Sequence, residues 1–180
     1  MNDETESRVR SVKLYVEENS EKITVMVDTL VSKYNQDLDD FINTVKENIV
    51  RKEKLTIFEI ENMCLKIPIF MYFSTSGVEN IGIQMDNAKS VKDTRYNNEY
   101  MDAKGTVGDK TAEAENEIIP EALTLIIYQR AYKKLKQKLD VCEILCRSAN
   151  KVLQSRISDL DITKNGVNYT QESRMKNKEE

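Results

Sequence analysis

The chain has 180 residues and a formal net charge of −4, and its composition excludes several classes of protein. It contains no histidine, which removes the usual general base and the commonest metal ligand. No run of apolar residues approaches the roughly 18 that a membrane-spanning helix needs. With 32% charged residues, two Pro and five Gly, the composition indicates long helices with few tight turns.

The first predicted element is a long amphipathic helix within residues 1–54, which contain neither Gly nor Pro. Apolar residues from Val9 to Ile49 recur mostly at steps of three or four, which is the spacing of one face of a helix. A gap in this pattern at Asn19–Ser20 indicates a weaker point. We therefore expect a helix near 5–54 that forms an N-terminal arm.

A helical core is predicted over residues 55–160, and it begins with Thr56 and Glu59 in the spacing of a capping box. This signal predicts a helix near 57–73, which Pro68 should break or kink. The apolar segment 67–73 is compatible with a buried strand or a helix, and we favour a helix because no second strand lies nearby. Residues 74–82 are predicted to form a turn, and a weaker helical pattern covers 84–102.

Residues 103–111 form the most Gly-rich loop of the chain. A phosphate-binding P-loop needs four residues between its glycines and a Lys directly after the second. Here two residues separate Gly105 from Gly108, and Asp109 follows the second glycine. We therefore interpret the loop as a connection to the last helix, which is predicted near 112–160 with Pro120 at a kink or in its first turn. The polar tail 161–180 is predicted to be disordered.

The segment 121–160 carries apolar residues at heptad spacing, and the chain is organised around it. This stripe must face another helix, from the same chain or from a second copy. The seam residues are Leu125, Tyr132, Leu135, Leu139 and Leu153. The expected fold class is all-α, an elongated long-helix hairpin or coiled-coil-like bundle that forms a homo-oligomer. The opposite face is basic, with Arg130, Lys133, Lys134, Lys136, Lys138, Arg147, Lys151 and Arg156 against Asp140 and Glu143.

The three cysteines are interpreted as reduced. Cys142 and Cys146 lie four apart on one helical face, where packing is favoured over metal binding because no further ligand type stands nearby. An odd number of thiols and no signal peptide predict a cytoplasmic location. Carboxylates are plentiful, but none is paired with a base, so we expect no catalytic residue, no metal site and no cofactor.

Residues 60–160 resemble the UvsY-type recombination mediators of bacteriophages, which are small helical proteins that help load a recombinase onto single-stranded DNA. Two stretches carry the resemblance: the basic, Tyr-containing segment 88–100 before the Gly loop, and the run 146–156 that resembles the closing helix of the family. The resemblance implies that Lys92 and Arg95 contact DNA, with Lys89 and Lys104 as weaker candidates. The long arm before Thr56 and the acidic total charge depart from the family pattern.

Cations next to aromatic residues are also what single-stranded nucleic acid needs, because phosphates bind the cations and unpaired bases stack on the rings. Arg95 precedes Tyr96 and Tyr100, and Arg130 lies between Tyr128 and Tyr132. For Tyr132 we favour packing in the seam, whereas both interpretations stay open for Tyr96 and Tyr100. The candidate DNA-binding residues are Lys89, Lys92, Arg95, Tyr96, Tyr100, Lys104 and Arg130.

Two functions follow as hypotheses. The first is a non-enzymatic phage recombination mediator, located in the cytoplasm of the infected bacterium, that binds single-stranded DNA and contacts a recombinase or a single-strand-binding protein. The second is a structural or scaffolding helical phage protein that oligomerises through coiled-coil seams without binding DNA.

Overall fold

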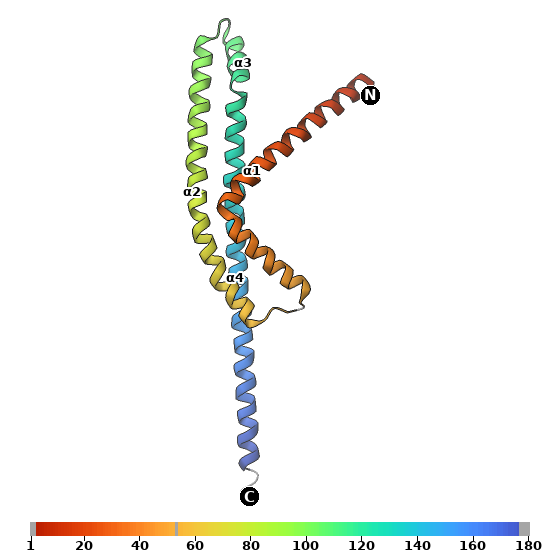
Figure 1. Cartoon of the computed structure of the whole chain (residues 1–180), viewed down its shortest axis with the longest axis vertical. Coiled ribbons are helices and arrows are strands. Elements are labelled where there is room, and N and C mark those ends of the chain that lie inside the picture. The colour runs from red at the N-terminus through yellow and green to blue at the C-terminus, as the bar shows by residue number, and fades with distance from the viewer. Residues whose placement is uncertain (1–2, 53, 177–180) are drawn as a thin grey trace. The chain divides into compact units, whose positions relative to one another are not determined.

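The computed structural model describes the backbone of residues 3–52 and 54–176, and the side chains of residues 13–14, 16–52 and 54–160. Over these residues the chain forms four helices and no strand (Figure 1). They are α1 (Asp3–Arg51), α2 (Ile57–Asp102), α3 (Val107–Glu117) and α4 (Ile119–Lys176). The prediction of an all-α fold built on long helices is confirmed.

The helices form two compact units, which are described separately. Unit 1 comprises Met1–Gln36 and Tyr72–Leu139, and unit 2 comprises Asp37–Met71 and Asp140–Glu180. Helices α1, α2 and α4 therefore contribute residues to both units. This division cuts across the expected separation of an arm at 1–54 from a core at 55–160.

Helix α2 is one continuous helix, so the prediction of a turn at 74–82 is wrong. Ser and Gly are common in turns, but Ser74 and Gly77 are both buried and face a neighbouring helix. Pro68 likewise lies inside the helix without ending it. Pro68 is exposed, and it removes the helical hydrogen bond to the carbonyl four residues earlier.

The last predicted helix, 112–160, is two helices. Helix α3 begins earlier, at Val107, because Thr106 and Asp109 form a capping box: the Thr106 N–H donates to Asp109 Oδ2 at 3.0 Å. Gly105 precedes this cap with a φ of 117°, a left-handed conformation that favours glycine. The chain breaks at Ile118, and Pro120 lies in the first turn of α4, where its missing N–H costs no helical hydrogen bond.

Helix α4 extends beyond the predicted end at residue 160, to Lys176. The backbone of 161–176 is therefore helical in the structure, which differs from the disorder expected for the tail. Residues 177–180 lie outside the described residues.

The core of unit 1 forms where α1, α2 and α4 meet. Its buried residues are Val27, Val31, Ile81, Ala131 and Leu135, and α2 and α4 run side by side there (Figure 1).

A buried polar contact joins α1 to α2 beside this core. The Ser74 hydroxyl donates to Asn35 Oδ1 at 3.1 Å. One turn further along α2, a Cβ atom added to Gly77 would lie 2.6 Å from Tyr34 Cγ. The two helices therefore approach so closely that only glycine fits at this position.

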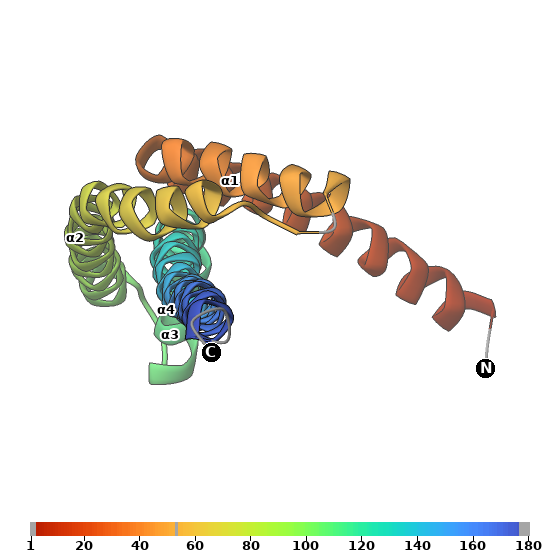
Figure 2. The ribbon, with the colours of Figure 1, turned by 90° about the horizontal axis from the view of Figure 1, so that it is seen from below.

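In unit 2, the end of α1 contacts the start of α2 across the loop that joins them (Figure 2). The rings of Phe41 and Phe70 have centroids 5.6 Å apart, and Lys66 Nζ lies 5.6 Å from the Phe41 centroid. The buried residues of this unit come from three helices and are Leu38, Val45, Ile60, Met63, Ile67, Cys142 and Ala149.

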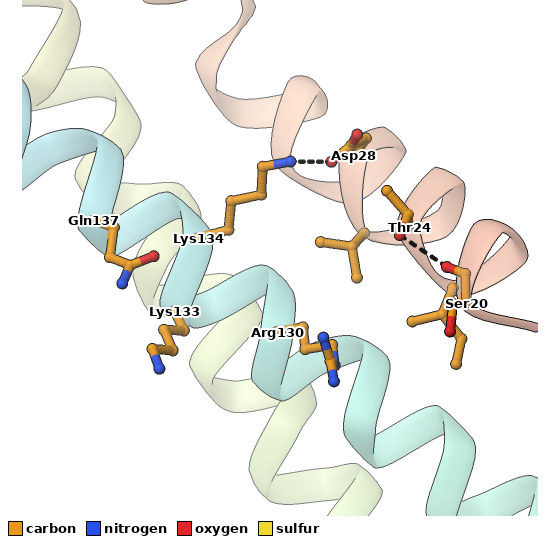
Figure 3. A pocket seen from close by; sticks show the side chains of 9 residues that line it. Ser20, Thr24, Asp28, Arg130, Lys133, Lys134 and Gln137 are labelled. Carbon is orange, nitrogen blue, oxygen red and sulfur yellow. Dashed lines mark hydrogen bonds and ion pairs between the residues drawn. The ribbon is translucent and has the colours of Figure 1, made fainter. Parts of the chain in front are cut away.

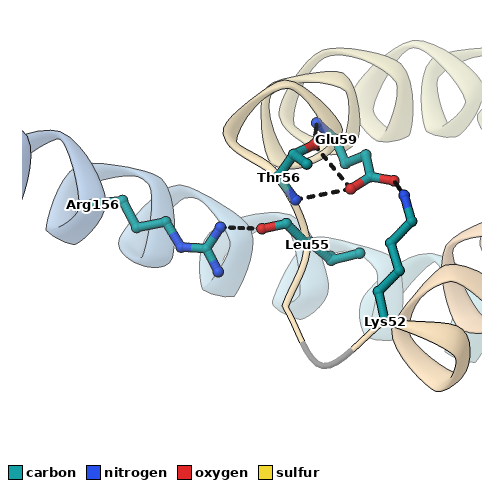
Figure 4. A network of polar contacts seen from close by, with 5 residues as sticks. All are labelled: Lys52, Leu55, Thr56, Glu59 and Arg156. Atoms are coloured by element: carbon teal, nitrogen blue, oxygen red, sulfur yellow. Dashed lines mark hydrogen bonds and ion pairs between the residues drawn. The ribbon is translucent and has the colours of Figure 1, made fainter.

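The loop between α1 and α2 is held by polar contacts on both sides (Figure 4). Glu59 Oε2 accepts from the Thr56 N–H at 2.8 Å, which confirms the predicted capping box, and Glu59 Oε1 accepts from Lys52 Nζ at 2.5 Å. From α4, the Arg156 guanidinium donates to the Leu55 carbonyl. The Lys52 hydrogen bond and then the Thr56 hydrogen bonds lower the pKa of Glu59 from 4.5 to about 2.

We predict that Gly77→Ala destabilises unit 1, because the new methyl group overlaps the Tyr34 side chain and pushes α1 away from α2. Overpacking of this kind costs roughly 1–3 kcal/mol, measurable by denaturant unfolding. Gly82→Ala is the matched control, since its Cβ would meet Tyr132 Cε2 at an ordinary 3.5 Å. The control should be neutral or stabilising by up to about 1 kcal/mol, because Ala is the better helix former. Equal effects of the two substitutions would contradict the close approach at Gly77.

We also predict that the Thr56–Glu59 cap contributes stability that depends on pH. Because the folded pKa of Glu59 is depressed, this contribution is complete above pH 4.5 and is lost as the pH falls toward about 2. Glu59→Gln retains an acceptor but no charge. The unfolding temperature of the parent should exceed that of the variant above pH 4.5, and the two should converge on acidification. A difference that stays constant down to pH 2 would refute this role.

Candidate nucleic-acid interface

The two cations that the resemblance assigns to DNA contact lie on α2 and are paired with carboxylates. Lys92 Nζ is 3.7 Å from Asp93 Oδ1, and Arg95 Nε is 2.8 Å from Glu99 Oε1. Lys89 and Lys104 are exposed. Lys92 and Arg95 would therefore have to exchange an existing partner for a phosphate.

The two tyrosines beside them stack on each other. The ring centroids of Tyr96 and Tyr100 are 6.1 Å apart with an interplanar angle of 21°, and Lys110 Nζ lies 5.9 Å from the Tyr100 centroid. Both side chains are half-buried. A nucleic-acid base could not insert between these rings without separating them.

The charge of this part of unit 1 also disfavours a polyanion. Residues 84–117 contain five Lys or Arg and eight Asp or Glu, a net charge of −3. Four of the acids belong to α3. The residues from Lys89 to Lys104 therefore lie in an acidic part of the chain, which disfavours DNA binding there. The structure does bring Tyr96 and Tyr100 together.

A groove of about 510 Å³ between α1 and α4 offers a different arrangement within unit 1 (Figure 3). Ile23 and Val27 form its apolar lining. Its polar residues are Ser20, Thr24 and Asp28 from α1 and Arg130, Lys133, Lys134 and Gln137 from α4. Arg130 is thus the one predicted DNA-binding residue that lines this groove.

The groove carries three cations against one carboxylate. Lys134 extends across it and donates to Asp28, whereas Arg130 extends toward the α1 segment that carries Ser20 and Thr24 (Figure 3). Arg130 and Lys133 are exposed and have no ion pair with any described residue. The lining therefore keeps an excess of two positive charges in a concave site, which is where an anion is attracted most strongly.

The α4 segment beside the groove is the most basic part of the chain. Residues 130–138 contain five cations and no carboxylate. Lys136 is exposed and continues this surface beyond the groove lining. An extended anion would meet several cations in succession along this segment.

The aromatic residues near the groove are used for packing. Tyr128 and Tyr132 both pack against the core of unit 1. The structure thus agrees with the packing interpretation of Tyr132, and it leaves the groove without a ring among its lining residues. Contacts in this groove would be made to phosphates and sugars.

The predicted oligomer seam lies largely inside the chain. Leu125, Leu135 and Leu139 are buried, and Tyr132 and Leu153 are half-buried, by contacts with other helices of the same chain. Most of the Leu125–Leu153 stripe is therefore covered without a second copy.

None of the three cysteines forms a disulfide; Cys142 is buried, and Cys64 and Cys146 are half-buried. Burial raises the pKa of the Cys64 thiol, and Cys146 adds to this shift. Among the described residues, no group of three or more Cys, Asp or Glu is placed to hold a metal ion.

Sequence reasoning did not identify the groove, because its two sides lie about 100 residues apart in the chain. Lys133 and Lys134 are recognisable as part of a basic helix face, but nothing in the sequence indicates that Ser20, Thr24 and Asp28 lie opposite them. The Lys134–Asp28 ion pair spans 106 residues.

Comparisons of the chain with protein families, with curated proteins and with solved structures find no match. The resemblance to UvsY-type mediators therefore rests on the two sequence stretches alone. None of the described helices is both long and apolar enough to cross a membrane.

Proposed function

We propose that this chain binds single-stranded DNA without enzymatic activity, and that it holds the phosphate backbone in the groove between α1 and α4. Arg130 and Lys133 would contact phosphates directly. Lys136 would extend the contact along α4. The observation that supports this proposal most strongly is that Arg130 and Lys133, two of the five cations of 130–138, line a concave site and have no ion pair with any described residue.

The dimensions of the groove favour one strand over a duplex. Its volume of about 510 Å³ lies in the range of sites that enclose small molecules, so it has room for a short piece of one backbone. A rigid duplex would meet only the outer edge of such a groove. Because phosphate contacts carry no sequence information, binding should be largely independent of sequence.

The biological role that we propose is that of a recombination mediator, as the resemblance implies. Such a protein needs a DNA contact that can be released when a recombinase takes over the strand. Binding by a few cations meets this need, because electrostatic contacts to phosphates are strongly salt-dependent and exchange readily.

We predict that Arg130→Ala/Lys133→Ala weakens binding of a labelled single-stranded oligonucleotide by at least about tenfold at low salt, since two charge-assisted contacts are lost. The slope of log K against log salt should decrease by about 0.7 for each lost contact. Lys92→Ala/Arg95→Ala is the matched control, because it removes the same charge from cations that are paired in the chain. It should retain most of the affinity. Fluorescence anisotropy at several salt concentrations measures both quantities.

If the Lys92/Arg95 variant loses affinity and the Arg130/Lys133 variant does not, the DNA-binding site lies on α2 instead. If the parent chain does not bind single-stranded DNA at low salt, the proposed function is wrong and the scaffolding alternative is favoured.

We further predict that Asp28→Asn strengthens binding. The substitution removes the one carboxylate of the groove lining and releases Lys134 to contact a phosphate. The Lys134–Asp28 pair is only half-buried and contributes little to stability, so the fold should be retained. Anisotropy should report a tighter complex with a steeper salt dependence. An unchanged or weaker affinity would exclude Lys134 from the DNA contact.

A further inference from the structure

Helix α2 has two opposite apolar faces within unit 2, and only one of them is covered. Ile60, Met63 and Ile67 are buried against the rest of the unit. At 100° per residue, Phe58, Leu65 and Ile69 lie on the opposite side of the helix. These three side chains are 71%, 66% and 53% exposed. A helix that is apolar on both sides is expected to be buried on both sides.

The exposed face has the spacing of a coiled coil. Phe58, Asn62, Leu65 and Ile69 are separated by steps of four, three and four residues; Asn62 is half-buried and lies at the edge of this face toward α1. In heptad terms Phe58 and Leu65 occupy d positions, and Asn62 and Ile69 occupy a positions. Beyond this unit the register continues at Tyr72 and Ser76, meets Glu79 at the next d position and reaches an apolar residue again at Ile83.

The residue types in this register fit a second copy of the same helix in parallel orientation. A β-branched residue at a, here Ile69, combined with Leu at d favours two parallel strands. A single Asn at an a position, here Asn62, fixes register and a two-stranded state because the two amides can bond to each other.

The flanking charges are self-complementary in the same register. Glu61 falls at a g position and Lys66 at the following e position, which is the pair that faces across a parallel two-stranded coiled coil. Both side chains are exposed, and Lys66 would leave the Phe41 ring to form this ion pair. Two symmetry-related ion pairs would therefore form, Glu61 of each copy with Lys66 of the other.

We propose that the exposed face of α2 formed by Phe58, Asn62, Leu65 and Ile69 is a homodimer interface, in which two copies of α2 pair in parallel. This interface is separate from the Leu125–Leu153 stripe, most of which the chain covers itself. The inference goes beyond the proposed DNA binding and does not depend on it, because no residue of the groove lies in this face.

The mass of the full chain in solution tests the interface. Light scattering of the parent at micromolar concentration should return about twice the 20.8 kDa of one chain. Leu65→Asp/Ile69→Asp should reduce the mass to 20.8 kDa with unchanged helical circular dichroism, since both side chains are exposed in the single chain. Val141→Asp is the matched control: it places a charge at a 63% exposed apolar position of α4 in the same unit, and should leave the mass doubled.

Charge exchange tests the parallel register. Glu61→Lys or Lys66→Glu alone should raise the dimer dissociation constant severalfold by placing like charges opposite each other. The double exchange, Glu61→Lys/Lys66→Glu, should restore the parent value. Asn62→Cys should form an intermolecular disulfide under mild oxidation, because only in a parallel pair does residue 62 face itself; the parent chain with its three native thiols is the control.

Each alternative has its own result. A parent mass of 20.8 kDa up to high micromolar concentration would overturn the proposal, as would a dimer unaffected by Leu65→Asp/Ile69→Asp. The parallel register would be overturned by a different combination of results. In that case Leu65→Asp/Ile69→Asp would abolish the dimer, but the double charge exchange would not restore the parent dissociation constant and Asn62→Cys would not form a cross-link. DNA affinity is measured separately on the Arg130/Lys133 variant, so failure of one proposal leaves the other standing.

Discussion

The contact between α1 and α2 at Gly77 determines the geometry on which the rest of unit 1 depends. Because Gly77 has no side chain, Tyr34 lies directly against the α2 backbone, and Asn35 reaches Ser74 in the same layer. The register set by this hydrogen bond places Val27 and Val31 against Ile81, Ala131 and Leu135. It also places Asp28 opposite Lys134. A small shift of α1 along α2 would therefore disturb the core and the basic groove together.

Helical periodicity was sufficient to predict the fold class. Apolar residues at every third or fourth position indicate one face of a helix, and the chain has too few Gly and Pro to interrupt such helices often. Prediction from the sequence failed where a residue type is common in two kinds of structure. Ser74 and Gly77 are typical of turns, yet they are also the small residues that closely packed helices need. Only the position of Tyr34, about 40 residues away in the chain, distinguishes the two. The capping box at Thr56 was predictable because both of its partners lie within four residues.

The candidate site was less predictable than the fold. A run of residues indicates which side chains are cationic, but not which carboxylates they meet. Lys92 and Arg95 form ion pairs within their own helix, whereas Arg130 and Lys133 have none with any residue whose side chain the structure describes. The sequence likewise shows which residues are aromatic but not what their rings contact: Tyr96 stacks on Tyr100, whereas Tyr132 packs on the core. The resemblance to a mediator family is the reason for proposing a nucleic-acid contact, and the charge distribution is the reason for proposing it on α4 rather than on α2.

The contacts of α4 have a consequence for how the protein is made. Lys134 meets Asp28, and Arg156 meets Leu55, across 106 and 101 residues of chain. During synthesis, α1 and α2 leave the ribosome well before α4 does, so the apolar surfaces that α4 covers remain open to solvent for that interval. Nascent chains in this condition are prone to aggregate. The apolar surfaces of α1 and α2 are thus fully covered only once the last helix has been synthesised.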